Sequence, residues 1–97
     1  MQIALARFTL KPGVTEEGLL SASDEFEDGL VQHQDGIIRR VLVRDLTGGY
    51  ADIVFFESSE AMERVIAAEQ DDEVCARYMS MIEDGQPDEF EILKTYE

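Results

Sequence analysis

The chain has 97 residues, 44% of them hydrophobic, which suits one domain over residues 1–97 with a modest core. Its 22 acidic residues against 8 basic ones give a formal charge of −14, which disfavours nucleic acids and anionic membranes as partners. A lone cysteine excludes an intrachain disulfide, and no run reaches the roughly 18 apolar residues of a membrane span, so we expect a reducing, cytoplasmic location.

The first third of the chain predicts a strand and a helix. Residues 2–10 have the composition of a strand, which Lys11-Pro12-Gly13 ends. Thr15 suits the N-cap of a helix that stops near Gln34-Asp35-Gly36. Its buried face is expected to comprise Leu19, Ala22, Phe26, Leu30 and His33.

Residues 37–45 and 50–57 predict an antiparallel hairpin, joined by a glycine-containing turn. A two-residue turn at Thr47-Gly48 or at Gly48-Gly49 gives the same parity of side chains. One face is then formed by Ile37, Arg39, Val41, Val43, Tyr50, Asp52, Val54 and Phe56. The other face is formed by Ile38, Arg40, Leu42, Arg44, Ala51, Ile53 and Phe55.

The last third predicts a second helix, capped by Ser58 or Ser59 and interrupted near residues 69–72. Helical spacing resumes with Val74, Tyr78, Met81 and Ile82, and a final strand is expected at Phe90, Ile92, Leu93 and Tyr96. This order of elements is the ferredoxin-like β-α-β-β-α-β split fold, an α+β architecture with a four-stranded antiparallel sheet and helices on one face.

Apolar residues occur on both faces of the predicted strands, whereas two helical stretches can cover only one face. We therefore expect a homodimer in which a second chain covers the other face of the sheet. Arg7, Arg40 and Arg44 are expected on that face, either in salt bridges across the interface or around an anionic ligand.

Three segments carry a resemblance to a known family. They are Arg7-Phe8-Thr9-Leu10-Lys11-Pro12-Gly13-Val14, then Gln34-Asp35-Gly36-Ile37, then Ala51-Asp52-Ile53-Val54-Phe55-Phe56-Glu57-Ser58 leading to Glu60-Ala61. In this order and spacing they resemble the antibiotic biosynthesis monooxygenase-type family of dimeric α/β barrels, over essentially the whole chain. The resemblance implies two subunits packed sheet to sheet, with a ligand cavity between sheet and helices in each subunit.

Several chemistries occur in families of this kind, so the resemblance alone does not fix the reaction. Haem-degrading members rely on an Asn in the first strand, a Trp at the end of the third strand and a His in the last helix. The closest positions here are Ala6, Phe56 and Tyr78, and the chain has no Asn or Trp, which disfavours haem degradation. Cofactor-independent oxygenases of the family act on polyketide-type phenols, which implies a small apolar or aromatic ligand and no cofactor.

Asp52 is the strongest catalytic candidate, because a carboxylate inside an apolar strand is costly to bury without a function or a partner. It is predicted to act as a base, helped by Tyr50 or Tyr78, while Arg39 stabilises the resulting anion. Further ligand contacts are expected from Phe56, Met79 and His33. The structural alternatives for Asp52 are an ion pair with Arg39 or a position near an exposed strand end. Those for the other residues are core packing of the apolar side chains and a capping or buried structural role for His33.

The sequence is compatible with two functions, an enzyme and a non-catalytic protein. An apolar cavity with converging polar atoms from Tyr50, Asp52 and Tyr78 would favour an enzyme, whereas a cavity filled by Phe56, Met79 and Met81 would favour a non-catalytic binding or structural dimer. No metal site is expected, since Asp71-Asp72-Glu73 lacks the alternating spacing of a calcium loop. The acidic surface fits ordinary solvation or a cytoplasm of very high salt.

Overall fold

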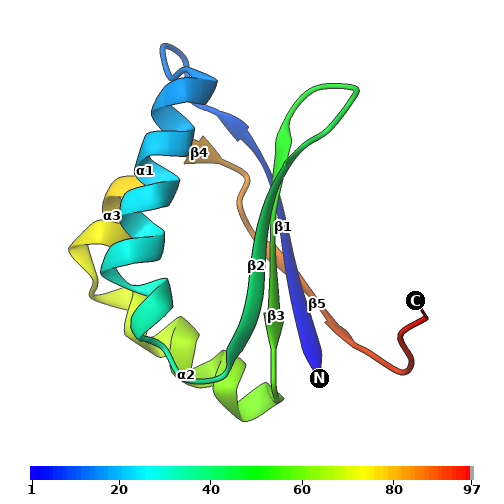
Figure 1. Ribbon diagram of the computed structural model, residues 1–97. Helices are drawn as coiled ribbons and strands as arrows, with labels where there is room; N and C mark the ends of the chain where they lie inside the picture. The colour runs from blue at the N-terminus through cyan, green and yellow to red at the C-terminus, as the bar shows by residue number, and fades with distance from the viewer. Residues whose placement is uncertain (97) are drawn as a thin grey trace.

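The computed structural model describes residues 1–96. Its elements are β1 (Gln2–Leu10), α1 (Glu16–Gly29), a short 3₁₀ helix η1 (Val31–His33), β2 (Ile37–Arg44), β3 (Tyr50–Phe56), α2 (Ser59–Gln70), α3 (Glu73–Met79), β4 (Ile82–Glu83) and β5 (Pro87–Glu91). Figure 1 shows α1, α2 and α3 on one side of a twisted sheet whose other side they leave uncovered. The predicted α+β class and ferredoxin-like arrangement are therefore confirmed, but the sheet has five strands instead of the predicted four.

The sheet is antiparallel throughout, in the order β2-β3-β1-β4, and β5 also pairs with β1. Because β4 pairs with the end of β1 and β5 with its beginning, the two short strands share one edge of the sheet. The last strand, predicted at Phe90, Ile92, Leu93 and Tyr96, lies earlier in the chain, at Pro87–Glu91. Pro87 begins β5 because the first residue of an edge strand needs no ladder donor, and Leu93 and Tyr96 lie exposed beyond it.

The helix starts follow their predicted caps. The Thr15 side chain accepts a hydrogen bond from the Gly18 N–H, and Ser58 accepts one from the Ala61 N–H. At the predicted interruption, Asp72 begins a new helix by accepting from the Cys75 N–H. Each side chain satisfies a donor that the first helical turn leaves unpaired, which fixes where α1, α2 and α3 start.

The hairpin between β2 and β3 differs from the predicted one. The Asp45 N–H donates to the Gly49 carbonyl at 2.9 Å, and the Gly48 N–H donates to the Asp45 carbonyl at 3.0 Å. The loop at residues 46–48 is thus of the three-residue type, with positive φ angles of 110° at Gly48 and 86° at Gly49. Because the loop has an odd number of residues, the side chains of β2 that follow the irregularity at residues 37–39 lie on the opposite face of the sheet from the predicted one.

With this register, Arg40, Leu42 and Arg44 share the helix-facing side with Tyr50, Asp52 and Val54. Arg39, Val41 and Val43 lie on the uncovered side with Ala51, Ile53 and Phe55. The predictions that Arg39 accompanies Asp52, and that Arg40 and Arg44 lie on the uncovered face, are therefore wrong. Arg7, opposite Ala51, does lie on the uncovered face as predicted.

The core lies between the sheet and the helices. Leu19 and Phe26 of α1 and Tyr78 of α3 pack with Phe8 of β1 in one buried cluster, and Val65 of α2 packs with Phe56 of β3 in another. Between these clusters the packing is incomplete. No helix in the described part of the chain is both long and apolar enough to cross a bilayer.

Candidate functional site

A cavity of about 240 Å³ lies between the sheet and the helices. Its walls come from Ala4, Ala6, Phe8, Phe26, Asp52, Val54, Phe56, Ile66, Glu69, Cys75, Tyr78, Met79, Ile82, Gly85 and Pro87. The volume is just below the range of about 300–1,000 Å³ typical of ligand pockets. Since a cavity of about 150 Å³ in another protein can hold a benzene molecule, one or two aromatic rings would fit here.

Asp52 is the polar wall of this cavity on β3, and Arg40 of β2 holds it in place. The Arg40 Nη2 donates to Asp52 Oδ2 at 2.9 Å, and Nε donates to Asp52 Oδ1 at 3.1 Å. Only 6% of the Arg40 side chain and 12% of the Asp52 side chain are exposed. A bidentate pair this deeply buried fixes the position of the carboxylate.

Arg40 also ties the sheet to α1. Its guanidinium donates to the Ser23 hydroxyl at 3.0 Å and lies 3.4 Å from Glu27 Oε1. Its carbon Cζ lies 4.9 Å from the centre of the Phe26 ring and 5.3 Å from that of Tyr78. Burial alone would lower the pKa of Arg40, but the charge and hydrogen bonds of Asp52 outweigh it and raise that pKa. The guanidinium is therefore a permanent positive charge beside the cavity.

Tyr78 of α3 completes the cluster. Its hydroxyl donates to Asp52 Oδ2 at 3.0 Å, and its ring stacks on Phe26 at a centroid distance of 5.1 Å. Burial, followed by the negative charge of Asp52, raises the pKa of Tyr78 well above its ordinary value. The phenol thus stays neutral and acts as a hydrogen-bond donor.

Glu69, in the last turn of α2, is a second carboxylate in the cavity wall and was not predicted from the sequence. Burial, then the charge of Asp52, raises its pKa to about 7. Its side chain makes no hydrogen bond to any of residues 1–96. In the sequence it stands in the acidic run Glu69-Gln70-Asp71-Asp72, where a solvated surface position is the normal expectation, so the sequence carries no signal that separates it from its neighbours.

The structure brings together only some of the predicted site residues. Asp52, Tyr78, Phe56 and Met79 all line the cavity. Tyr50 is on the correct face, but its hydroxyl donates to Glu16 at 3.1 Å and its ring stacks on Phe8, outside the cavity. Burial and the Glu16 hydrogen bond raise the pKa of Tyr50.

Two further predicted ligand contacts are absent from this site. Arg39 lies on the opposite face of the sheet, with its Cζ 5.9 Å from the centre of the Phe55 ring, so the alternative Asp52–Arg39 ion pair is also wrong. His33 is exposed at the end of η1 and takes no part in lining the cavity. Its predicted place on the buried face of a continuous helix fails because α1 ends at Gly29 and the chain tightens into a 3₁₀ turn.

The remaining reactive group of the cavity is Cys75. Burial, followed by the charge of Glu69, raises the pKa of its thiol to about 11, so the sulfur is protonated and a poor nucleophile at neutral pH. Within residues 1–96, no three side chains of His, Cys, Asp or Glu are grouped so that they could hold a metal ion. What the site offers chemically is an apolar pocket with a fixed ion pair, a phenol donor and one carboxylate that titrates near neutrality.

The packing around the cavity distinguishes the enzyme from the non-catalytic dimer considered above. Phe56 and Met79 form walls of the cavity rather than filling it, and Met81 packs against the core cluster around Phe8. Polar atoms converge in the cavity from Asp52, Tyr78 and Glu69 instead of the predicted Asp52, Tyr78 and Tyr50. The cavity is thus open, and Glu69 takes the place expected for Tyr50 among its polar residues.

Solved structures of other proteins share this fold. The chain aligns with At3g17210 from Arabidopsis thaliana at a TM-score of 0.81 and 14% identity, covering 99% of each chain. It aligns with SnoaB, a cofactor-independent oxygenase from Streptomyces nogalater, at 0.79 and 17% identity, over 97% of this chain and 94% of SnoaB. With an antibiotic biosynthesis monooxygenase-type protein from Chloroflexus aurantiacus the TM-score is 0.74 and the identity 12%, over 99% and 96% of the chains.

No family model and no curated protein matches the sequence itself. The similarity is therefore one of fold, and it is the fold of the antibiotic biosynthesis monooxygenase-type structures that the sequence resemblance predicted.

Proposed function

We propose that the protein binds a small hydroxylated aromatic molecule in the cavity and oxygenates it with molecular oxygen and no cofactor. The observation that carries this proposal is an open, largely apolar cavity into which Asp52, Tyr78 and Glu69 converge beside the buried charge of Arg40. Its volume of about 240 Å³ favours one or two fused rings. The fold shared with SnoaB, a cofactor-independent oxygenase, adds support.

The proposed reaction needs only the substrate and oxygen. An activated CH₂ group beside a phenol combines with O₂ to give a carbonyl group and water, so atoms and electrons balance without a metal or flavin. The substrate must first lose a proton, because only its electron-rich anion reduces oxygen. The buried charge of Arg40 beside the cavity would stabilise the developing negative charge.

Asp52 was predicted to be the base, and this assignment stays a prediction. Arg40 and Tyr78 already direct their donors to both of its oxygens. A carboxylate held by such charge-assisted bonds is well suited to orienting a hydroxyl group, and its oxygens have fewer free lone pairs to offer to a ligand's proton. The role that this geometry favours for Asp52 is therefore to position the ligand and Tyr78.

Oxygen uptake tests the proposal directly. One- to three-ring phenols, including dihydroquinones and anthrones, are incubated with the protein, and dissolved oxygen is followed against a protein-free control. We expect phenols with one or two rings to be oxidised faster with the protein than without it. Asp52→Asn, which removes the group that positions the ligand, should lower the rate by about 10²-fold. Asp24→Asn, an exposed change on α1, should leave the rate unchanged. No protein-dependent uptake with any phenol, or full activity of the Asp52→Asn variant, would contradict the mechanism.

A non-catalytic binding protein is the second candidate. Among the described residues, no buried side-chain nitrogen or oxygen lacks a hydrogen-bond partner. A cluster satisfied in this way can be purely structural, tying the sheet to α1 and α3. Tight binding of an aromatic ligand with no oxygen uptake would favour this function over the oxygenase.

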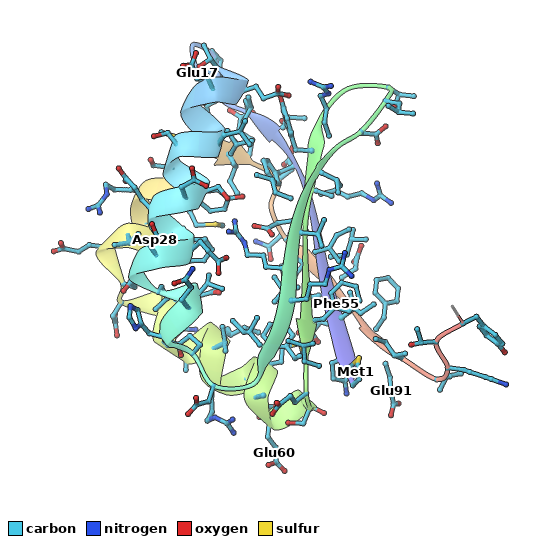
Figure 2. All side chains as sticks on the ribbon, in the orientation of Figure 1. Met1, Glu17, Asp28, Phe55, Glu60 and Glu91 are labelled. Atoms are coloured by element: carbon cyan, nitrogen blue, oxygen red, sulfur yellow. The ribbon has the colours of Figure 1, made fainter. Side chains whose placement is uncertain are left out.

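We also propose that the protein is a homodimer joined through the uncovered face of the sheet. That face carries Ile3, Leu5, Val41, Val43, Ile53, Phe55 and Phe90, with Arg7 and Arg39 among them. Figure 2 shows Phe55 on the side of the sheet away from the helices. A contiguous apolar face of this kind is rarely left in water, and a second copy of the chain is self-complementary to it.

A further inference from the structure

We propose that Glu69 is the proton acceptor of the cavity, taking the proton from the hydroxyl group of a bound phenol. The inference rests on the proposed aromatic ligand, but it does not require that the ligand reacts with oxygen. It assigns to Glu69 the role that sequence reasoning gave to Asp52.

The position of Glu69 supports this role. It lies in the last turn of α2 and lines the same cavity as Asp52 and Tyr78. The last turn of α2 contains no basic residue, so the negative end of the helix dipole acts on the carboxylate without compensation. This field, like burial, favours the protonated form.

The charged and titratable groups around Glu69 come from every neighbouring element. Asp52 of β3 and Asp72, the cap of α3, add negative charge, and Arg40 of β2 opposes them. From α3, Cys75 and Tyr78 face the same cavity, and both are protonated at neutral pH because burial raises their pKa values. Burial is the largest cause and, with the charges of Asp52 and Asp72 against that of Arg40, it raises the pKa of Glu69 to about 7.

The other carboxylates near the cavity already accept hydrogen bonds from the protein. Asp52 accepts hydrogen bonds from Arg40 and Tyr78, and Asp72 accepts one from the Cys75 N–H. Within residues 1–96, Glu69 has both carboxylate oxygens without a hydrogen-bond donor, so lone pairs are available to a ligand. A group with a pKa near the working pH is also the most efficient general base.

The proton-transfer step breaks one O–H bond and forms another. The O–H bond of the phenol breaks, its electron pair stays on the phenolate oxygen, and the proton forms an O–H bond with Glu69. The negative charge thus moves from Glu69 to the ligand and the net charge of the cavity is unchanged. The buried positive charge of Arg40, beside the cavity, then stabilises the phenolate.

Binding of 4-nitrophenol tests the inference without any oxygenation, because its ionised form has a distinct visible absorption. At a pH slightly above 7, we expect the wild-type protein to bind it as the phenolate. Calorimetry in two buffers of different ionisation enthalpy should show little proton release, since Glu69 keeps the proton. In Glu69→Gln the phenolate band should be lost, or its formation should release a proton to the buffer. Glu63→Gln, an exposed change on the same helix, is the matched control and should behave as wild type.

Activity gives a second readout. With an oxidisable phenol, Glu69→Gln should lower the rate by about 10²-fold and remove the ionisation near pH 7 from the pH profile. Asp52→Asn should retain an ionisation but move it to lower pH, because the charge of Asp52 helps to raise the pKa of Glu69. An Asp52→Asn variant that loses the ionisation, or a Glu69→Gln variant that retains the band without proton release, would overturn the inference.

The two proposals fail separately. Phenolate binding that depends on Glu69, without oxygen uptake by any phenol, would contradict the oxygenase and leave Glu69 as the proton acceptor. Oxygen uptake by wild type, with no phenolate band for bound 4-nitrophenol or no binding of it, would overturn the role of Glu69 and leave the oxygenase standing.

Discussion

Two carboxylates in one cavity have opposite surroundings. Asp52 accepts hydrogen bonds from a guanidinium and a phenol. Glu69 accepts none from residues 1–96, and burial and then the charge of Asp52 raise its pKa to about 7 against the opposing charge of Arg40. Environments that separate two acidic groups in this way are a recurrent means of dividing orienting and proton-transfer roles within an active site. The division is a consequence of which strand or helix carries each residue.

Removal of Arg40 tests how much the buried pair contributes. Arg40→Ala leaves Asp52 as an uncompensated charge with 12% of its side chain exposed, and we expect a loss of about 3–5 kcal/mol in the free energy of unfolding. Arg44→Ala is the control, since its pair with Glu16 is solvent-exposed and should be worth less than about 1 kcal/mol. Urea unfolding of both variants gives the comparison, and equal losses would contradict the structural role of the buried pair.

The raised pKa of Glu69 predicts a pH-dependent stability. The folded chain binds this proton more tightly than the unfolded chain, whose carboxyl has an ordinary pKa of 4.5. The contribution of Glu69 to the free energy of unfolding is therefore fully present below about pH 4.5 and is lost as the pH rises through about 7. Glu69→Gln should leave the free energy of unfolding nearly unchanged at low pH and raise it by about 1–3 kcal/mol above neutrality. A gain independent of pH, or the same gain in Glu63→Gln, would contradict this.

The candidate site was partly predictable from these residues. Asp52 is recognisable because a carboxylate stands out between Ile53 and Ala51 in an apolar strand. Arg40 and Arg39 are adjacent, so one residue of loop length decides which of them meets Asp52, and Leu46-Thr47-Gly48-Gly49 allows both parities. Glu69 becomes distinctive only through tertiary burial, which a run of acidic residues does not reveal.

At the scale of elements, the turn before β2 depends on a close approach to α2. Gly36 has a φ of +96°, and its carbonyl accepts from the Glu57 N–H at 2.9 Å. A Cβ at this position would collide with the Cβ of Ala61, in the first turn of α2. The glycine therefore lets the start of β2, the end of β3 and the start of α2 meet.

Substitution of Gly36 should lower the free energy of unfolding by more than the strain of its backbone conformation alone. We expect Gly36→Ala to lower the free energy of unfolding by about 2–4 kcal/mol, combining a left-handed backbone with overpacking against Ala61. Gly13→Ala is matched for backbone, with a φ of +87°, but a Cβ there meets no atom within 4 Å. It should cost about 1–2 kcal/mol. Equal losses in thermal or urea unfolding would mean that the contact with Ala61 relaxes freely.

Local signals account for which elements were predicted well. Thr15, Ser58 and Asp72 cap their helices through contacts within three residues, so the sequence alone contains the information. The strand at Pro87–Glu91 has no such signal, because proline and acidic residues are poor strand formers. It is a strand because β1 offers an unpaired edge, which is a property of the assembled sheet.

For the whole molecule, dimerisation through the uncovered sheet face is the first prediction. A chain of 97 residues buries only about 60–65% of its unfolded surface alone, so further burial should stabilise it considerably. Sedimentation at low micromolar concentration should give twice the chain mass. Phe55→Glu should produce monomers, because an unpaired carboxylate in the interface costs several kcal/mol. Leu46→Glu, at the fully exposed hairpin tip, should leave the dimer intact, and a wild-type monomer would contradict the sheet-to-sheet arrangement.

Salt dependence is the second whole-molecule prediction, and it follows from a net charge of −14 on a chain this short. Charges on the outer faces of the helices repel one another in dilute buffer, whereas at about 1 M salt the screening length falls to roughly 3 Å. Screening also weakens the exposed pairs of Arg7, Arg44 and Arg77, but each of these is worth less than about 1 kcal/mol. Relief of repulsion should therefore dominate, and the Tm should rise substantially between dilute buffer and molar KCl.

A variant with fewer charges separates this effect from general salt effects on hydrophobic burial. Asp24→Asn, Asp28→Asn and Glu63→Gln together remove three exposed negative charges that take part in no ion pair within residues 1–96. The triple variant should be more stable than wild type in dilute buffer and should gain less from KCl, because it has less repulsion to screen. A Tm that is unchanged or falls with KCl would mean that the acidic surface serves ordinary solvation. An equal gain in both proteins would assign the stabilisation to the apolar core.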